Sequence, residues 1–261
     1  MTIWISSDLD GSLLDHHTYS YAAAKPALEL CAKQQVPIVL NTSKTEAETR
    51  ALHSELGLRW PIAIENGSAL VFFDGKTRNK IFGQPRDKIL NFIETARSRN
   101  NVSLSGFNDL GLDGIIEHTG LSKESAELAA ERHYSEPFIW HDSNAALMRF
   151  VELAFEQDLI VLKGGRFYHL QGKTDKAQPL IWLQDNLNIF YAYKPQKSEL
   201  VCLGDNHNDI AMLDLADYPV CVKSPSSPFP KLTTDKAIIF TQDYGPVGWN
   251  KAVLELLETT Q

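Results

Sequence analysis

Two clusters of polar, mostly acidic residues could carry out chemistry, and each follows an apolar segment typical of a buried strand. In the first, Asp8 and Asp10 lie one residue apart after the β-prone residues 3–7, and Gly11 follows them. Because alternate side chains of a strand share a face, both carboxylates can lie on one side where the strand ends. Such a pair suits a hard divalent cation, or a nucleophile with a general acid. Taken alone, an Asp-x-Asp-Gly segment is also typical of a plain turn.

The second cluster follows the apolar residues 201–203. It consists of Gly204, Asp205, Asn206, Asn208 and Asp209. In parallel α/β sheets, ligands bind outside the carboxyl ends of the strands. Two strands that end in carboxylates can therefore place Asp8, Asp10 and Asp205 around one metal ion. The alternative interpretation of Asp205 and Asp209 is a turn and the N-cap of the next helix, but the occurrence of both clusters favours the metal site.

The two clusters resemble the first and fourth motifs of the haloacid dehalogenase (HAD) superfamily of phosphatases. Between them, Thr42 follows the apolar residues 36–40 and is similar to the hydroxyl residue of the second motif, while Lys176 is similar to the lysine of the third. The four motifs occur in the order of the family and span most of the chain. Residues 177–179 depart from the family pattern, which has a glycine and a further lysine after the motif-three lysine. We expect this departure to change phosphate access and not the reaction class.

The resemblance implies a phosphatase that works through a covalent intermediate. Asp8 would attack phosphorus and form an aspartyl-phosphate. Asp10 would protonate the leaving oxygen and later accept a proton from the attacking water. Thr42 would hold the phosphate, and Lys176 would neutralise phosphate charge and restrain Asp8. Without the other motifs, Lys176 would be interpreted as an exposed lysine and Thr42 as a strand-end cap.

The resemblance also implies Mg²⁺ as the cofactor, which supplies positive charge and positions the phosphoryl group. The ion would be bound by the side chains of Asp8 and Asp205 and by the backbone carbonyl of Asp10. Mg²⁺ keeps several of its waters, so a few protein ligands are enough. Asn208 and Asp209 would orient these ligands without binding the ion themselves.

The order of the expected elements indicates an α/β fold with an inserted domain. Residues 1–83 alternate between strands and helices, with helices expected at 21–34 and 44–57, and the alternation resumes over residues 171–261. Residues 84–170 have no strand that ends in carboxylates. The short strands expected there are 147–153, 159–162 and 166–170. By resemblance, residues 1–83 and 171–261 form a Rossmann-like parallel-sheet HAD core, and residues 84–170 form a smaller α/β cap that determines substrate specificity.

Further segments resemble mannosyl-3-phosphoglycerate phosphatases, which remove phosphate from a glycosylated phosphoglycerate. The segments are 43–45, 65–67, 131–138 and 164–170. Because that substrate carries both a phosphate and a carboxylate, its recognition calls for additional cations, which Lys44, Arg132 and Arg166 could supply. The alternative for Arg132 is a charge on a helix surface, and for Arg166 a turn position after two glycines.

Three hydroxyl or carboxylate side chains complete the expected substrate site. Ser135 and Glu136 would hydrogen-bond sugar hydroxyls, and Ser43 would join them from the segment that follows Thr42. The expected partner is therefore a small phosphorylated sugar or a glycosyl-phosphoglycerate, hydrolysed to a glycosylglycerate and phosphate.

Composition excludes several other classes of protein. The 261 residues carry a formal net charge of −8 and no basic stripe, which argues against a nucleic-acid partner. No apolar run is long enough to span a membrane. The first residues lack a charged segment and a cleavage site, so we expect no signal peptide and a cytoplasmic location. The three cysteines are widely spaced and are expected to be small buried hydrophobes rather than a disulfide framework or zinc site.

Two other interpretations remain open at this point. One keeps the enzyme class and changes the substrate, giving a broader sugar-phosphate phosphatase or a phosphomutase of the same subclass. The other is a binding or signalling module. Response-regulator receivers also combine acidic residues, a hydroxyl and a lysine, but they need about half this length and lack an inserted domain. An inactive homologue is disfavoured because Asp8, Asp10, Lys176 and Asp205 are all present.

Overall fold

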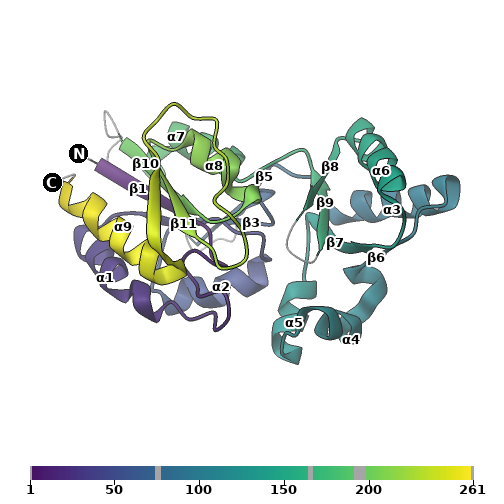
Figure 1. The fold of residues 1–261 in the computed structure, drawn as a ribbon, viewed down its shortest axis with the longest axis horizontal. Coiled ribbons are helices and arrows are strands. Elements are labelled where there is room, and N and C mark those ends of the chain that lie inside the picture. Colours follow the sequence, from purple (N-terminus) through teal and green to yellow (C-terminus); the bar gives the residue numbers. More distant parts are fainter. Residues whose placement is uncertain (1, 74–77, 164–166, 191–197, 260–261) are drawn as a thin grey trace.

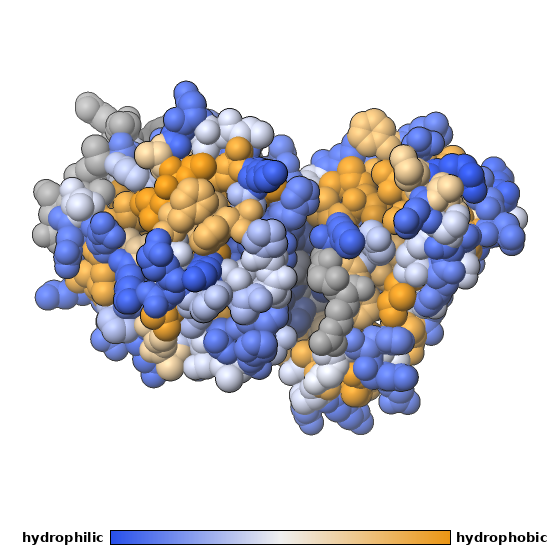
Figure 2. Space-filling view, in the orientation of Figure 1, coloured by the Kyte–Doolittle hydropathy of each residue, from blue (hydrophilic) through white to orange (hydrophobic). Residues whose placement is uncertain are grey.

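The computed structural model describes residues 2–73, 78–163, 167–190 and 198–259. It consists of a large lobe built around a parallel sheet and a small lobe built around an antiparallel sheet, drawn at the left and right of Figure 1. The small lobe is the part of the chain from helix α3 to strand β9. A deep groove separates the two lobes in the space-filling view, and its large-lobe edge is mainly hydrophilic (Figure 2).

The large lobe contains a five-stranded sheet with the strand order β12-β11-β10-β1-β2, in which all neighbouring strands are parallel. Its strands are β1 (Thr2–Ser7), β2 (Ile38–Leu40), β10 (Ser198–Gly204), β11 (Tyr218–Lys223) and β12 (Ile239–Tyr244). The adjacent side chains of Trp4 and Ile5 on β1 are both buried. Since they point to opposite faces, both faces of the sheet must be covered.

Helices cover the two faces of this sheet. They are α1 (Lys25–Gln34), α2 (Glu46–Glu55), α7 (Gln178–Asp185), α8 (Ile210–Leu215) and α9 (Gly245–Thr259), with short 3₁₀ turns η1 (Ala22–Ala24), η2 (Leu187–Ile189) and η3 (His207–Asp209). Cys31 of α1 and Trp249 of α9 pack in the core on the Ile5 side, whereas Leu183 of α7 and Met212 of α8 pack on the Trp4 side. The predicted α/β class with a parallel central sheet is confirmed.

A three-stranded antiparallel sheet continues the large lobe beyond β2. It consists of β3 (Ile62–Ile64), β4 (Ala69–Phe72) and β5 (Arg78–Ile81). An isolated parallel bridge between Asn41 and Ala63 joins it to the end of β2. The loop after β3 therefore lies beside the loop after β2, and both lie at the carboxyl ends of parallel strands.

The small lobe contains a four-stranded antiparallel sheet with the order β6-β7-β9-β8. Its elements are α3 (Arg86–Asn100), β6 (Leu104–Gly106), α4 (Phe107–Thr119), α5 (Lys123–Ala130), β7 (Ser135–Trp140), α6 (Asn144–Glu156), β8 (Leu159–Lys163) and β9 (Tyr168–Gly172). Ile93 of α3 and Phe150 of α6 share a buried cluster with Phe138 of β7 and Leu170 of β9. Helices α3 and α6 thus cover one face of this sheet.

The strand expected at residues 147–153 is wrong, because these residues lie within α6. The Ser143 side chain caps the helix by accepting a hydrogen bond from the Ala146 N–H (3.2 Å). The buried residues Ala146, Phe150 and Ala154 then recur every four positions, which is the spacing of one helix face. All three cysteines are free and buried, as expected. Within the described ranges, no helix is long and apolar enough to cross a membrane.

Candidate active site

The two acidic clusters meet at the carboxyl ends of neighbouring strands. β1 and β10 pair in parallel with Ser7 opposite Leu203, and the Asp8 N–H donates to the Leu203 carbonyl (2.9 Å). Carboxylate oxygens of Asp8, Asp205 and Asp209 lie within 4.8 Å of one another, and all three residues are buried. The structure therefore brings together side chains that are far apart in the sequence.

Lys176 lies fully buried among these carboxylates. Its Nζ is 2.5 Å from Asp8 Oδ1 and 2.6 Å from Asp209 Oδ1. Burial opposes the lysine charge, but the charges of Asp209 and Asp8 outweigh it and raise the pKa of Lys176. The lysine backbone is also held, because the Asn41 side-chain amide donates to the Lys176 carbonyl (2.8 Å). Lys176 is therefore a fixed cation and not a solvated surface lysine.

Asp209 caps the 3₁₀ turn η3 and also bonds Lys176. Its Oδ2 accepts the backbone N–H groups of Asp205 and Asn206, each at 3.0 Å, which is a capping arrangement at η3. Its Oδ1 bonds Lys176. Gly204 permits this packing, because a Cβ on that residue would lie 2.6 Å from the Asp209 side chain. Asp209 thus fixes the backbone on which Asp205 is mounted.

The carboxylates outnumber the positive charge beside them, and this changes their acidity. Burial, followed by the charge of Asp209, raises the pKa of Asp205 to about 7. Burial also raises the pKa of Asp8, although Lys176 opposes the rise. A divalent cation with a preference for oxygen ligands would relieve this repulsion, so the donor set fits Mg²⁺. Gly11, at φ +86°, leaves space for the Asp205 side chain, because a Cβ on Gly11 would lie 2.6 Å from Asp205 Oδ2.

The loop after β2 adds a hydroxyl and a second cation. Thr42 is buried, and its Oγ1 accepts the Lys44 N–H (3.1 Å). Lys44 Nζ lies 2.9 Å from Asp10 Oδ2 and 3.8 Å from Glu48. Burial lowers the pKa of Lys44, but these two carboxylates raise it by more. The other oxygen of Asp10, Oδ1, is buried and has no hydrogen-bond partner among the described residues.

Two of the residues expected to bind substrate reach this loop from the small lobe. Arg132 Nη1 donates to the Ser43 carbonyl (3.2 Å) and to Ser135 Oγ (2.9 Å). Ser43, Arg132 and Ser135 therefore lie together where the lobes meet. Arg166, which was also expected to bind substrate, lies outside the described residues.

Glu136, in contrast, has both carboxylate oxygens engaged within the small lobe. Oε2 accepts from Nε (2.9 Å) and Nη2 (2.7 Å) of Arg86, and Oε1 accepts the Asn108 N–H (2.7 Å). The side chain is fully buried, and burial raises its pKa despite these partners. A Cβ on Gly106 would lie 2.5 Å from Glu136 Oε1, which leaves little space on that side.

Glu65 and Asn66 are site residues to which the sequence assigned no role. The buried Glu65 carboxylate accepts the N–H groups of His133 (2.9 Å) and Tyr134 (3.1 Å) and the hydroxyl of Ser135 (2.5 Å). Asn66 accepts from the Asn208 side chain (3.0 Å). Both have positive φ, +47° and +55°, and such strain in non-glycine residues is typical of functional loops. The signal available in the sequence was the family resemblance of the segment 65–67.

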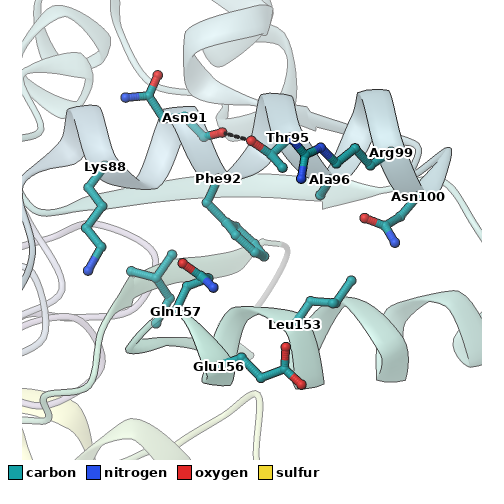
Figure 3. A pocket seen from close by; sticks show the side chains of 11 residues that line it. Lys88, Asn91, Phe92, Thr95, Ala96, Arg99, Asn100, Leu153, Glu156 and Gln157 are labelled. Atoms are coloured by element: carbon teal, nitrogen blue, oxygen red, sulfur yellow. Dashed lines mark hydrogen bonds between the residues drawn. The ribbon is translucent and has the colours of Figure 1, made fainter.

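A groove of about 550 Å³ lies elsewhere, between α3 and α6 of the small lobe (Figure 3). Its walls carry Lys88 and Arg99 from α3 and Glu156 from α6, and the Phe92 ring points into it. These helices cover the side of the antiparallel sheet that bears Phe138 and Leu170. None of the residues of the acidic clusters lines it, so the groove is separate from the candidate active site.

Comparison with known proteins agrees with this geometry. The family model for haloacid dehalogenase-like hydrolases matches residues 5–153 and 172–233. A glucosyl-3-phosphoglycerate/mannosyl-3-phosphoglycerate phosphatase from Methanococcoides burtonii is 35% identical over 97% of this chain and 96% of its own length. A protein of the same name from Persephonella marina is 34% identical, with the same shares of both chains.

Solved structures agree in fold. A haloacid dehalogenase-like hydrolase from Bacteroides thetaiotaomicron superposes with a TM-score of 0.68 and 18% identity, over 98% of this chain and 100% of that one. One from B. subtilis gives a TM-score of 0.65, also at 18% identity, over 100% of both chains. At this identity the likeness concerns the fold alone. The match of the family model and the two phosphatase relatives together show that this chain belongs to the haloacid dehalogenase-like hydrolases.

Proposed function

We propose that this protein is a Mg²⁺-dependent phosphatase that hydrolyses mannosyl-3-phosphoglycerate, or its glucosyl counterpart, to the glycosylglycerate and phosphate. The observation that carries the proposal is the buried ion-pair cluster in which Lys176 lies between Asp8 and Asp209, with Asp205 beside them. The names of the two relatives support the choice of substrate.

In the proposed reaction, Asp8 is the nucleophile. Lys176 holds Oδ1 of Asp8, so that Oδ2 attacks phosphorus while the bond from phosphorus to the leaving oxygen breaks. Asp10 donates a proton to that oxygen, and the glycosylglycerate departs as an alcohol. Asp10 then takes a proton from water, which attacks phosphorus and releases phosphate from Asp8. Lys44, whose Nζ lies 2.9 Å from Asp10 Oδ2, would hold that carboxyl in place during the two steps.

The charge of the phosphoryl group needs several cations. Mg²⁺, held by Asp8, Asp205 and the backbone carbonyl of Asp10, would place positive charge beside the phosphoryl oxygens. Lys176 and the Thr42 hydroxyl would contact the same oxygens from the protein side. Asn208 and Asp209 would keep Asp205 in place, since Asp209 bonds the Asp205 N–H and Asn208 bonds Asn66.

We propose that residues 84–170 act as the cap over a core formed by residues 1–83 and 171–261. Arg132 would then bind the substrate carboxylate beside Ser43 and Ser135. For Glu136, whose oxygens are bonded to Arg86 and to the Asn108 N–H, we propose support of the lobe in place of contact with a sugar hydroxyl.

The test is phosphate release with Mg²⁺ from mannosyl-3-phosphoglycerate, glucosyl-3-phosphoglycerate and simple sugar phosphates. We expect kcat/KM to favour the glycosyl-phosphoglycerates by at least about 100-fold, since the simple sugar phosphates lack the carboxylate that Arg132 would bind. Asp8→Asn is the matched blank and should lose more than about 10⁴-fold in kcat while its Tm stays within a few degrees. Equal turnover of simple sugar phosphates would exclude the substrate assignment and favour a broader sugar phosphatase. Retention of activity by Asp8→Asn would exclude the nucleophile.

A further inference from the structure

The loop that follows Asp10 and the turn after it is closed by its own hydrogen bonds. The Asp15 N–H donates to the Ser20 carbonyl (3.0 Å), and the Tyr19 N–H donates to the Asp15 carbonyl (2.9 Å). The Asp15 side chain also accepts the N–H (2.8 Å) and the hydroxyl (2.9 Å) of Thr18. These bonds hold Tyr19 at a φ of +54°, and such strain in a non-glycine residue is typical of functional loops. The loop therefore presents the Tyr19 side chain in a defined position.

The Tyr19 ring lies beside the lysine that binds Asp10, the proposed general acid. Lys44 Nζ is 5.3 Å from the centre of the Tyr19 ring and 2.9 Å from Asp10 Oδ2. A cation over a ring is a favourable contact and stabilises this arrangement. Tyr19 is nevertheless 50% exposed, and the Asp10 side chain is 37% exposed. An accessible aromatic surface therefore lies one side chain away from the proposed acid.

This aromatic surface lies where the two lobes meet. The two residues that flank Lys44 in the sequence both bond the small lobe. The Ser43 carbonyl accepts from Arg132 Nη1 (3.2 Å), and Thr45 Oγ1 donates to the Leu128 carbonyl of α5 (2.9 Å). A substrate bound between the lobes at the proposed acid would therefore have the tyrosine ring close to it on the large-lobe side.

In the proposed substrate, the sugar is close to the oxygen that Asp10 would protonate. Glycerate has three functional groups, of which one is the carboxylate and one carries the phosphate, so the glycosyl group occupies the hydroxyl on the carbon next to the phosphorylated one. When the leaving oxygen contacts Asp10, the sugar ring is only a few bonds away. The faces of a sugar ring carry C–H groups, which can pack on an aromatic ring and remove apolar surface from water.

We propose that Tyr19 is a specificity-determining residue, whose ring packs against the sugar ring of the substrate while Asp10 contacts the leaving oxygen. This inference rests on the proposed function. It assigns a sugar contact to the large lobe, in addition to those expected from the small lobe. The ligand class is a phosphate monoester with a sugar ring a few bonds from the ester oxygen. Phosphate monoesters without such a ring would not use Tyr19.

The test compares two substrates across two variants of Tyr19. Mannosyl-3-phosphoglycerate and 3-phosphoglycerate carry the same phosphate and carboxylate, but only the first carries a sugar. Tyr19→Leu removes the ring and keeps an apolar side chain, whereas Tyr19→Phe removes only the hydroxyl. With mannosyl-3-phosphoglycerate, we expect Tyr19→Leu to raise KM about five- to tenfold and to keep kcat within about twofold, because a ring contact made in the bound substrate is lost.

Two further results are expected from the same set. Tyr19→Phe should keep KM for mannosyl-3-phosphoglycerate within about twofold, because the ring is retained. With 3-phosphoglycerate, both variants should stay within about twofold of the wild type in kcat/KM. The inhibition constant of 3-phosphoglycerate replaces kcat/KM if this compound binds without turnover.

Phe155→Leu is the matched control. Phe155 of α6 is also exposed (59%) and also has a lysine over its ring, with Lys173 Nζ 3.6 Å from the ring centre. Helix α6 packs on the face of the antiparallel sheet that bears Phe138, whereas Gln171 on the other face bonds Asn66 of the large lobe. We expect Phe155→Leu to behave as wild type with both substrates.

Three outcomes would overturn the proposal. A fall in kcat, or equal losses on both substrates, would show that Tyr19 acts through Lys44 and Asp10 or supports the fold. A loss in Tyr19→Phe as large as that in Tyr19→Leu would assign recognition to the hydroxyl and not to the ring. An unchanged KM of Tyr19→Leu for mannosyl-3-phosphoglycerate would remove Tyr19 from the sugar site.

The result also separates this inference from the proposed function. If the wild type prefers another phosphorylated sugar, the proposed substrate is wrong, and the same variants are compared on the preferred sugar and on 3-phosphoglycerate. A rise in KM confined to the sugar would then still support the ring contact of Tyr19. A wild type that hydrolyses no phosphorylated sugar would overturn both the proposed function and the role of Tyr19.

Discussion

The two lobes both bury charged side chains, but they balance them differently. In the large lobe, Lys176 faces Asp8 and Asp209, and Asp205 adds a further carboxylate. In the small lobe, Glu136 faces Arg86 in a one-to-one pair, and the Asn108 N–H satisfies its remaining oxygen. The first cluster keeps an excess of negative charge, whereas the second is a neutral pair in which both carboxylate oxygens of Glu136 accept hydrogen bonds.

Under the proposed function, this difference is that between a site built for chemistry and one built for support. An excess of buried carboxylate is unfavourable by itself, since like charges and burial both raise the pKa of such groups. It becomes favourable when a divalent cation occupies the site. A neutral bonded pair needs no ligand, and removing either partner strands the other. The variants below act on one cluster or the other.

The largest expected effect comes from Lys176→Met, which removes the cation from the large-lobe cluster. Asp8 and Asp209 would then face each other without a partner, and we expect a loss of about 3–5 kcal/mol in unfolding free energy at pH 8. The loss should be smaller at pH 5, because Asp8, whose pKa burial raises, can then retain its proton. Turnover should fall by more than about 10³-fold. Urea unfolding at both pH values and a phosphate-release assay measure these effects.

Lys251→Met is the control for that variant. Lys251 pairs with Asp243 at the surface (2.7 Å), where both side chains are exposed, so its removal should change the unfolding free energy by less than about 1 kcal/mol. If Lys176→Met were as stable as the control, the cluster would not depend on its lysine, and the contrast between the lobes would fail.

The acidic residues of the large-lobe cluster could be found from the sequence, and the Glu136–Arg86 pair of the small lobe could not, for a physical reason. Asp8 and Asp205 each follow an apolar strand, and parallel strands bring such positions to one edge of the sheet. Lys176 has no such local pattern, so its role came from the family resemblance. The sugar contact expected of Glu136 stays a prediction, and its bond to Arg86, fifty positions away in the sequence, was not predicted. Pairings within an antiparallel sheet and its helices depend on tertiary packing.

The same limit applies to Glu65 and to α6. Glu65 accepts the backbone N–H groups of residues 133 and 134. Because almost every residue has a backbone N–H, the residue types at these positions do not indicate such a bond. The apolar residues within 147–153 were compatible with a strand or a helix, since short apolar runs do not distinguish the two. The cap at Ser143, four residues upstream, was the signal that decides for the helix.

The next effect concerns pH and metal. The pKa of Asp205 is raised to about 7, whereas an aspartate in the unfolded chain titrates near 4. The folded state therefore holds a proton that the unfolded state has lost, and the metal-free protein should become less stable as the pH rises through this interval. Mg²⁺ would bind the deprotonated carboxylates, so we expect it to raise Tm more at pH 8 than at pH 5. Thermal unfolding with excess EDTA or excess Mg²⁺ measures both trends.

Asp205→Asn should flatten both trends, because it removes the carboxyl with the raised pKa and one expected metal ligand. Asp113→Asn, at an exposed position on α4, should leave them unchanged. A Mg²⁺-dependent rise in Tm that persists in Asp205→Asn would place the metal elsewhere. Stability of the metal-free wild type that increased between about pH 4 and pH 7 would contradict the excess of carboxylate in the cluster.

The smallest expected effect comes from Glu136→Gln in the small lobe. The amide keeps the size of the side chain but loses the charge that faces Arg86, so we expect a loss of about 1–3 kcal/mol in unfolding free energy. Activity on p-nitrophenyl phosphate should stay within about twofold, because the cluster at Asp8 is untouched. Glu94→Gln, at an exposed residue that pairs with Arg97, is the control and should be nearly neutral. Glu136→Gln could instead keep its stability and raise KM for the glycosyl-phosphoglycerate alone. Glu136 would then contact the sugar, and the small lobe would use its buried charge for substrate recognition rather than for support.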